Sequence, residues 1–289
     1  MKPKSFLFSI ILLFSVLMVP LGFTIPIQEN LSENTGRQTL DKILEKTANY
    51  CERVKDIALF YICKEKVEDE RYFFSNRNLL KFSVSSSDEI EPGRMRKKTY
   101  TYDYQLVKKE KELREKRILL EEDGKEKYEE NVEFRPVKYS GKYLVYGAVG
   151  FLSRQWQPRF EYKVVGQDIV EGRKTIIIES FPKEEREENC NYGRIWVDEE
   201  DSSILKIEYD PRSIKDFENE PSQSAAGELR RTVVWFISYG IEKHGVRFPG
   251  QQLIQEFYVN GEGERILLEK ISFSYEDYKF FVVETEVKY

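Results

Sequence analysis

The chain has 289 residues, of which 40% are hydrophobic and 34% are charged, and its formal net charge is −5. Basic and acidic residues are interspersed without a basic stripe, which argues against a nucleic-acid partner. The length suits one large domain or two small ones, and 19 phenylalanines, 18 tyrosines and 3 tryptophans supply material for a core.

The first 24 residues predict a secretory signal peptide. Lys2 and Lys4 precede an unbroken apolar run, and Pro20, Gly22 and Thr24 follow it. We place the cleavage site near Thr24, and cleavage there changes the formal charge from −5 to −7. The alternative is an uncleaved inner-membrane anchor, because about 18 apolar residues can span a bilayer. Either way the rest of the chain is expected to be periplasmic or otherwise exported.

The next segments predict a flexible lead-in and then one amphipathic helix. Residues 25–38 are polar and show no period. Thr39 is placed to cap a helix that continues to about residue 54. Its apolar stripe, which needs a packing partner, consists of Leu40, Leu44, Thr47, Cys51 and Val54.

Three cysteines raise the question of a disulfide: Cys51, Cys63 and Cys190. Cys51 and Cys63 are twelve residues apart, which is about 18 Å along one helix. A disulfide holds Cα atoms about 5.5–6 Å apart. Cys51 and Cys63 are therefore a candidate pair only if the helix ends and the chain turns back between them. The alternative is two buried, reduced thiols.

Strand patterns follow the helix. The sequence is strand-like from Leu59, and residues 83–93 predict a loop. Tyr100, Tyr102 and Tyr104 repeat at every second position, so all three leave one side of a strand. The charged stretch 112–122 has a helix-like composition, but its alternation and the Asp-Gly pair after it favour a hairpin strand.

The rest of the chain predicts further strands of the same sheet. Residues 143–156 are apolar and interrupted by glycine, which indicates a short helix or covering loop. Strands follow at 160–169 and 173–181, and a hairpin at 192–210; residues 211–228 form the longest loop before strand signals resume. The fold class predicted is α+β, with about ten or eleven strands in one curved antiparallel sheet.

Some of these strands are apolar on both sides. In the hairpin, Ile195 and Val197 share one face, but Trp196 lies on the other with two charged residues. Ile177 and Trp235 lie in two further strands of this kind. A sheet with one face in water should not show this pattern. The strands are either covered on both faces by other layers of the protein, or the curled sheet lines a pocket for an apolar ligand.

No catalytic or metal-binding motif is present in the sequence. The single histidine, His244, lies in a turn-like segment, and one histidine cannot form a multi-histidine metal site. Phosphate-binding loops and nucleophile elbows are absent from the sequence. We therefore expect a non-enzymatic protein without catalytic residues, metal or cofactor.

The hairpin carries the pattern G-x-[IV]-W-[IVL]-D at residues 193–198, followed by Ile204–Ile207. With its signal peptide, one helix and antiparallel strands, the chain resembles the outer-membrane lipoprotein carrier superfamily, which has the LolA/LolB-like fold. The blocks "YDYQLV", "RILLEEDGK", "GFLSRQWQPRFEYKVVG" and "YEDYKFFVVETEV" are similar to those of exported bacterial proteins of this kind. The resemblance covers residues 39–289 as one domain.

The resemblance implies an unclosed β-barrel whose helices form a lid over a cavity for acyl chains. The implied function is a monomeric periplasmic carrier that binds a lipid or a lipidated protein. The alternative is an envelope sensor or scaffold that binds a membrane-associated partner protein through the same fold. The residues expected to line the cavity are Trp196, Ile177, Trp235, Phe151, Leu152, Trp156, Tyr102 and Phe160.

Overall fold

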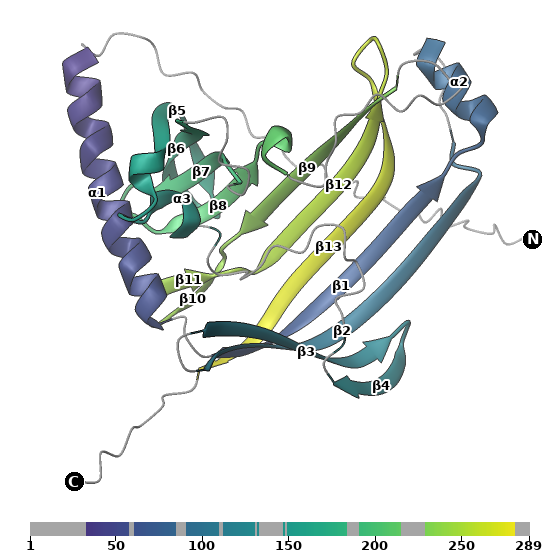
Figure 1. The fold of residues 1–289 in the computed structure, drawn as a ribbon, viewed down its shortest axis with the longest axis horizontal. Coiled ribbons are helices and arrows are strands. Elements are labelled where there is room, and N and C mark those ends of the chain that lie inside the picture. The colour runs from purple at the N-terminus through teal and green to yellow at the C-terminus, as the bar shows by residue number, and fades with distance from the viewer. Residues whose placement is uncertain are drawn as a thin grey trace, which may run out of the picture.

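A computed structural model describes residues 33–57, 61–84, 91–109, 112–130, 132, 147, 149–183, 191–214 and 229–280 (Figure 1). The predicted signal peptide, residues 25–32 of the lead-in and Cys190 lie outside the described residues.

Eleven strands form one antiparallel sheet in the order β4-β3-β2-β1-β13-β12-β9-β8-β7-β6-β5. Its two ends, β4 and β5, are not paired with each other, so the strongly curved sheet stays open (Figure 1). This confirms the predicted fold class. The strands are β1 (Tyr61–Phe73), β2 (Arg94–Lys109), β3 (Glu112–Glu122), β4 (Lys125–Glu130), β5 (Phe160–Val170), β6 (Arg173–Pro182), β7 (Gly193–Asp198), β8 (Ile204–Tyr209), β9 (Arg230–Ser238), β12 (Gln251–Val259) and β13 (Arg265–Phe280). A separate small hairpin consists of β10 (Ile241–Lys243) and β11 (Val246–Phe248).

The helices differ in part from those expected. The first helix, α1 (Glu33–Ile57), begins six residues earlier than predicted, so Thr39 lies inside it and does not cap it. A second helix, α2 (Asn76–Val84), was not predicted, and its last two residues fall in the segment 83–93 that was expected to be a loop. The apolar segment before β5 forms α3 (Val149–Leu152) and the 3₁₀ turn η3 (Gln157–Arg159), and η4 (Pro211–Ser213) follows β8.

Helices α1 and α2 lie at opposite ends of the long central strands (Figure 1). α1 packs against α3 and the β10–β11 hairpin. The buried side chain of Asn260, in the turn after β12, donates a hydrogen bond to the Phe82 carbonyl of α2 (3.2 Å). Each helix therefore marks one end of the sheet.

Tight turns fix the register of the strands. Asp123 and Gly124 both have positive φ angles, 50° and 75°, which suits the two-residue turn between β3 and β4. This confirms that residues 112–122 form a strand. Gly193 begins β7 where a Cβ atom would lie 2.9 Å from the Cα of Tyr209 and 2.8 Å from the Asp210 nitrogen, so no larger residue fits there.

The two faces of the sheet follow from the alternation of side chains along each strand. On β1, the side chains of Tyr61, Cys63 and Val67 join one buried cluster that includes residues of α1 and α3. We call this side the inner face and the opposite side the outer face. Lys66 and Glu68 alternate with these inward positions along the strand, so they point to the outer face.

Candidate functional site

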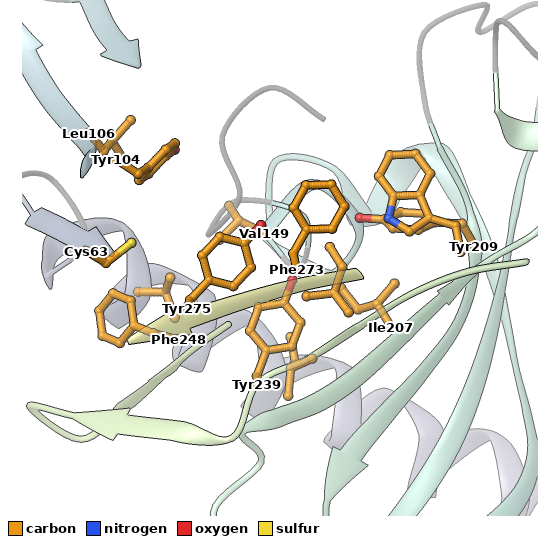
Figure 2. Close-up of a cluster of buried hydrophobic side chains, with 14 of the residues drawn as sticks. Cys63, Tyr104, Leu106, Val149, Ile207, Tyr209, Tyr239, Phe248, Phe273 and Tyr275 are labelled. Carbon is orange, nitrogen blue, oxygen red and sulfur yellow. The ribbon is translucent and has the colours of Figure 1, made fainter. Parts of the chain in front are cut away.

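The inner face carries a large apolar zone. Its side chains come from strands across the sheet, from β11 and from α3, and Figure 2 shows them converging. Aromatic rings dominate: the Tyr61 ring centroid lies 5.8 Å from those of Tyr104 and Phe248 and 5.4 Å from that of Tyr278. These side chains are at most 9% exposed, so an apolar ligand would reach them only after a covering element moved; burial of apolar area would then drive its binding.

Helix α1 covers part of this apolar zone as a separate layer. Tyr50, Cys51 and Val54 are at most 2% exposed and belong to the same cluster as the inner-face side chains. Half-buried Ile43 and Leu44 pack against it. The apolar stripe of α1 thus rests on the surface that an apolar ligand would use.

Three polar contacts attach α1 to its neighbours. The Arg247 amide donates to the Tyr50 hydroxyl (2.9 Å), and burial raises the pKa of that tyrosine to about 12. Gln157 Nε2 donates to the Leu44 carbonyl (2.7 Å), and Arg154 Nη2 donates to Asn49 Oδ1 (2.6 Å). These partners lie on β11 and just after α3, so these three contacts tie α1 to the elements beside the sheet.

Beside the apolar zone, toward α2, the inner face is charged. Glu256 lies opposite Glu269, and Glu269 lies opposite Arg71 in the strand register. Arg71 Nε lies 2.7 Å from Glu269 Oε1, and Arg71 Nη2 lies 3.2 Å from Asp69 Oδ2. Glu256 also forms an ion pair with Arg231. We call this row the charged belt, and it consists of Arg231, Glu256, Glu269, Arg71, Asp69, Arg96 and Lys98.

The belt contains a pocket of about 180 Å³ between β1 and β2, which we call the belt pocket. It is lined by Asp69, Arg71, Arg96, Lys98 and Tyr100. Asp69 is 6% and Tyr100 8% exposed, so these two form its buried base. The pocket therefore presents three cationic side chains and one carboxylate at the border of the apolar zone.

One ion pair lies inside the apolar zone itself. Arg117 Nε and Nη2 donate to the two carboxylate oxygens of Glu65, at 2.6 and 3.2 Å. The Arg117 guanidinium also lies 4.7 Å from the centre of the Tyr104 ring. Burial disfavours the charge on Arg117, but the adjacent Glu65 outweighs this and raises its pKa.

Two of the expected lining residues lie elsewhere. Trp196 and Ile177 are cross-strand neighbours on the outer face, opposite in direction to Ile195 and Val197 of the inner cluster. The position expected for Trp196, in the cavity or under the lid, therefore differs from its observed position.

The outer-face position of Trp196 has a physical reason. Its Nε1 donates to Asp168 Oδ2 (3.0 Å), and the Lys206 ammonium lies 4.2 Å from its ring centre. A lysine can cover an apolar ring with its methylene chain while its charge reaches water. Side chains of the neighbouring strands β5 and β8 thus contact the tryptophan at its ring nitrogen and over its ring face.

Other expected lining residues do come together on the inner side. Trp235 of β9, Tyr102 of β2, and Phe151 and Leu152 of α3 belong to the inner cluster. The Phe160 ring lies 6.0 Å from that of Phe151.

Trp156 lies beside η3 and is only half-buried. The Arg159 guanidinium is 4.4 Å from its ring centre. It borders α3 rather than the centre of the apolar zone.

The candidate disulfide is absent: Cys51 and Cys63 are not bridged, and both thiols are buried. Cys51 lies on the inward side of α1 and Cys63 on β1. Burial raises the pKa of both thiols, that of Cys51 to about 12. Both side chains therefore act as small apolar core residues.

The charged belt was not foreseen from the sequence. Asp69 and Arg71 follow Cys63, Glu65 and Val67 at every second position, so they had to share the inner face. This alternation was the available signal. Charged residues make up 34% of the chain, and this abundance masks the signal.

A further pocket of about 400 Å³ lies across the outer face of the central strands. Its lining includes Lys66, Glu68, Phe236, Leu253 and Lys270.

Within the described ranges, no His, Cys, Asp and Glu side chains are grouped to hold a metal ion. Across the same ranges, no helix is both long and apolar enough to cross a membrane.

Comparisons with known proteins return structures of the superfamily that the hairpin motif resembles. A LolA superfamily protein from Nitrosomonas europaea is 11% identical, with a TM-score of 0.33 over 86% of this chain and 96% of that one. A Vibrio parahaemolyticus domain described as an outer membrane lipoprotein-sorting protein is 9% identical, with a TM-score of 0.36 over 86% and 94%. MucB in the Pseudomonas aeruginosa MucA/MucB complex is 8% identical, with a TM-score of 0.22 over 84% and 100%. No protein-family model and no curated protein matches the sequence.

Proposed function

We propose that this is an exported, non-enzymatic binding protein that holds the acyl chains of a lipid or lipidated protein against the inner face. The observation that carries the proposal is that the inner face is apolar in one part and charged in the next. An aromatic apolar zone lies beside a charged belt, and α1 covers the apolar zone as a separate layer. An amphiphilic ligand has the same division between chain and head group.

The ligand chain would exchange with the apolar stripe of α1. Tyr50, Cys51 and Val54 now occupy the inner surface, so a chain enters when the helix lifts and takes over its contacts. Each methylene group that leaves water contributes about 0.8 kcal/mol. Binding thus compensates for the apolar contacts that α1 gives up.

The attachments of α1 are weak enough for such exchange. A hydrogen bond contributes about 1 kcal/mol net, and the three described contacts of α1 join it to Arg247, Gln157 and Arg154. Burial of about four methylene groups offsets the loss of all three. The further methylene groups of an acyl chain would replace the apolar contacts that α1 gives up.

The test is to purify residues 25–289 from an exported preparation and extract the protein with organic solvent. Mass spectrometry is expected to find acyl lipid in a fixed ratio to protein. A fluorescent fatty-acid probe should bind the delipidated protein and be displaced by unlabelled fatty acid. Heat-unfolded protein serves as the control for non-specific uptake. Absence of both copurified lipid and probe binding would overturn the proposal.

A second candidate is a sensor or scaffold that binds a partner protein, and the edge strand β5 favours it. β5 ends the strand order, and its Ile169 side chain is 67% exposed. An extended segment of a partner could add to this edge by backbone hydrogen bonds. Replacement of the β5 residue Gln167 by proline would remove its amide donor there; capture of one dominant protein by the unaltered chain but not by this variant would support the candidate.

A further inference from the structure

We propose that the belt pocket binds a phosphate group, and that this phosphate is the head group of the amphiphile whose chains the apolar zone holds. The second half of this inference rests on the proposed function; the first half does not. The pocket lies between β1 and β2 and is lined by Asp69, Arg71, Arg96, Lys98 and Tyr100.

The strand register places like charges together in this pocket. Arg71 lies directly opposite Arg96 in the β1–β2 pair, and Lys98 lies opposite Asp69. Residues directly opposite on neighbouring antiparallel strands have Cβ atoms about 4.5–5.5 Å apart, and like charges in such pairs are destabilising. The register thus places the Arg96 side chain beside Arg71, and an anion bound at Arg96 would relieve the repulsion that the carboxylates paired with Arg71 leave.

The existing carboxylates neutralise two of the three cations. Arg71 is held by Asp69 and Glu269, at 3.2 and 2.7 Å. Lys98 Nζ lies 2.6 Å from Asp123 Oδ2 and 3.5 Å from Glu122 Oε1. Each of these cations has a fixed position as a result.

Arg96 differs from its neighbours. Within the part of the chain that the structure describes, it forms no ion pair. The pKa of Asp123 is lowered first by hydrogen bonds from Lys98 and the Thr99 amide, and the charge of Arg96 adds a smaller contribution. Its guanidinium thus keeps its donors for another partner, and arginine matches phosphate oxygens with two parallel N–H donors.

The size and position of the pocket suit a phosphate attached to apolar chains. Its volume of about 180 Å³ corresponds to about six waters at 30 Å³ each. Tyr100, at the buried base of the pocket, belongs to the inner cluster, and its ring stacks on Tyr102 of the apolar zone, with centroids 6.0 Å apart. The pocket and the apolar zone are therefore continuous along β2.

The experiment compares three probes by isothermal titration calorimetry on delipidated residues 25–289. The probes are dihexanoyl phosphatidic acid, dihexanoylglycerol with the same chains but no phosphate, and inorganic phosphate. Phosphatidic acid is expected to bind more tightly than dihexanoylglycerol. Arg96→Gln is expected to weaken phosphatidic acid about tenfold, the effect of one lost charge-assisted contact, and to leave dihexanoylglycerol unchanged.

Lys97→Gln is the matched control. It makes the same change of charge on the adjacent residue, but Lys97 points to the outer face and pairs with Glu68 (3.0 Å) and Glu70 (3.3 Å). Both side chains are on the surface, so both variants are expected to fold, and thermal melting verifies this. Equal loss of phosphatidic acid binding in the two variants would overturn the phosphate site, as would equal affinity of the unaltered protein for the two lipids.

The three probes distinguish a failure of this inference from a failure of the proposed function. Dihexanoylglycerol binding without any preference for phosphatidic acid supports the apolar zone and overturns the belt pocket. Binding of inorganic phosphate that depends on Arg96, with no binding of either lipid, supports the pocket as a phosphate site and overturns its assignment to a lipid head group.

Discussion

Arg117 on β3 reaches across β2 and forms a two-pronged ion pair with Glu65 on β1. The Glu65 side chain is 1% exposed and the Arg117 side chain 14%. The pair lies among the aromatic side chains of the apolar zone, with Tyr102 and Tyr104 on the strand between. A buried pair of this kind holds three strands in a fixed relation on the face that we propose binds ligand.

Arg117→Met is expected to destabilise the protein by about 3–5 kcal/mol, because it leaves the Glu65 carboxylate buried without its partner. The double variant Glu65→Leu/Arg117→Met should recover most of that loss, since neither charge then remains. Urea denaturation followed by circular dichroism measures both. A single variant as stable as the double one would contradict this role for the pair.

Tyr50→Phe is expected to loosen α1. The change removes the acceptor of the buried Arg247 amide, and an unsatisfied buried donor costs about 1–3 kcal/mol. Hydrogen exchange of the α1 amides should accelerate, and uptake of a fatty-acid probe should become faster.

Tyr72→Phe is the control for this variant, because the Tyr72 hydroxyl donates to Glu70 near the α2 end of β1. Faster exchange in both variants alike would show that α1 is not held by the Tyr50 contact.

The positions of two tryptophans predict which one reports on ligand. Trp235 belongs to the inner cluster, whereas Trp196 lies on the outer face under Lys206. A ligand-induced change in intrinsic fluorescence should persist in Trp196→Phe and be largely lost in Trp235→Phe. Thermal melts establish that both variants are folded. Loss of the signal in Trp196→Phe alone would place the ligand on the outer face instead.

Asp198 is expected to make the β7–β8 turn sensitive to acid. Burial works to raise its pKa, but hydrogen bonds from Arg173 and from the Asp201 and Glu200 amides outweigh this and lower the pKa from its ordinary value. A lowered pKa in the folded state stabilises the protein above the unfolded pKa of about 3.9. That contribution is lost as the pH falls through the lower, folded value.

Asp198→Ala should therefore destabilise the protein at neutral pH by about 2 kcal/mol, the value of a hydrogen bond to a charged group. The difference from the unaltered protein should shrink below about pH 4. Urea denaturation at pH 7 and pH 3 measures this. A difference that is the same at both pH values would exclude the carboxylate charge as its cause.

Local patterns predicted most strands correctly, because side-chain alternation and turn residues are properties of neighbouring residues. The Asp-Gly pair at 123–124 located the β3–β4 hairpin, and the hairpin predicted at 192–210 contains β7 and β8. The beginning of α1 was less well predicted, since its first turn is polar and carries no period.

The site depends on relations that no local pattern contains. Arg71 belongs to the belt because β1 lies between β2 and β13, which brings Arg96 and Glu269 to its two sides. Likewise Trp196 is buried on the outer face because β5 and β8 supply Asp168 and Lys206. Each case depends on the order of strands in space, which the order of strands along the chain does not reveal.

The pairing of β1 with β13 also sets the order in which the protein can assemble. Tyr61 pairs with Phe280 in the middle of the sheet, so two segments far apart in the chain form its central seam. Until β13 has been synthesised, β1 and β12 each have one edge without a hydrogen-bonded neighbour. Pairing of strands that are far apart in the sequence is slow. A chain stopped before residue 265 should consequently leave two half-sheets with unpaired edges that are prone to aggregation.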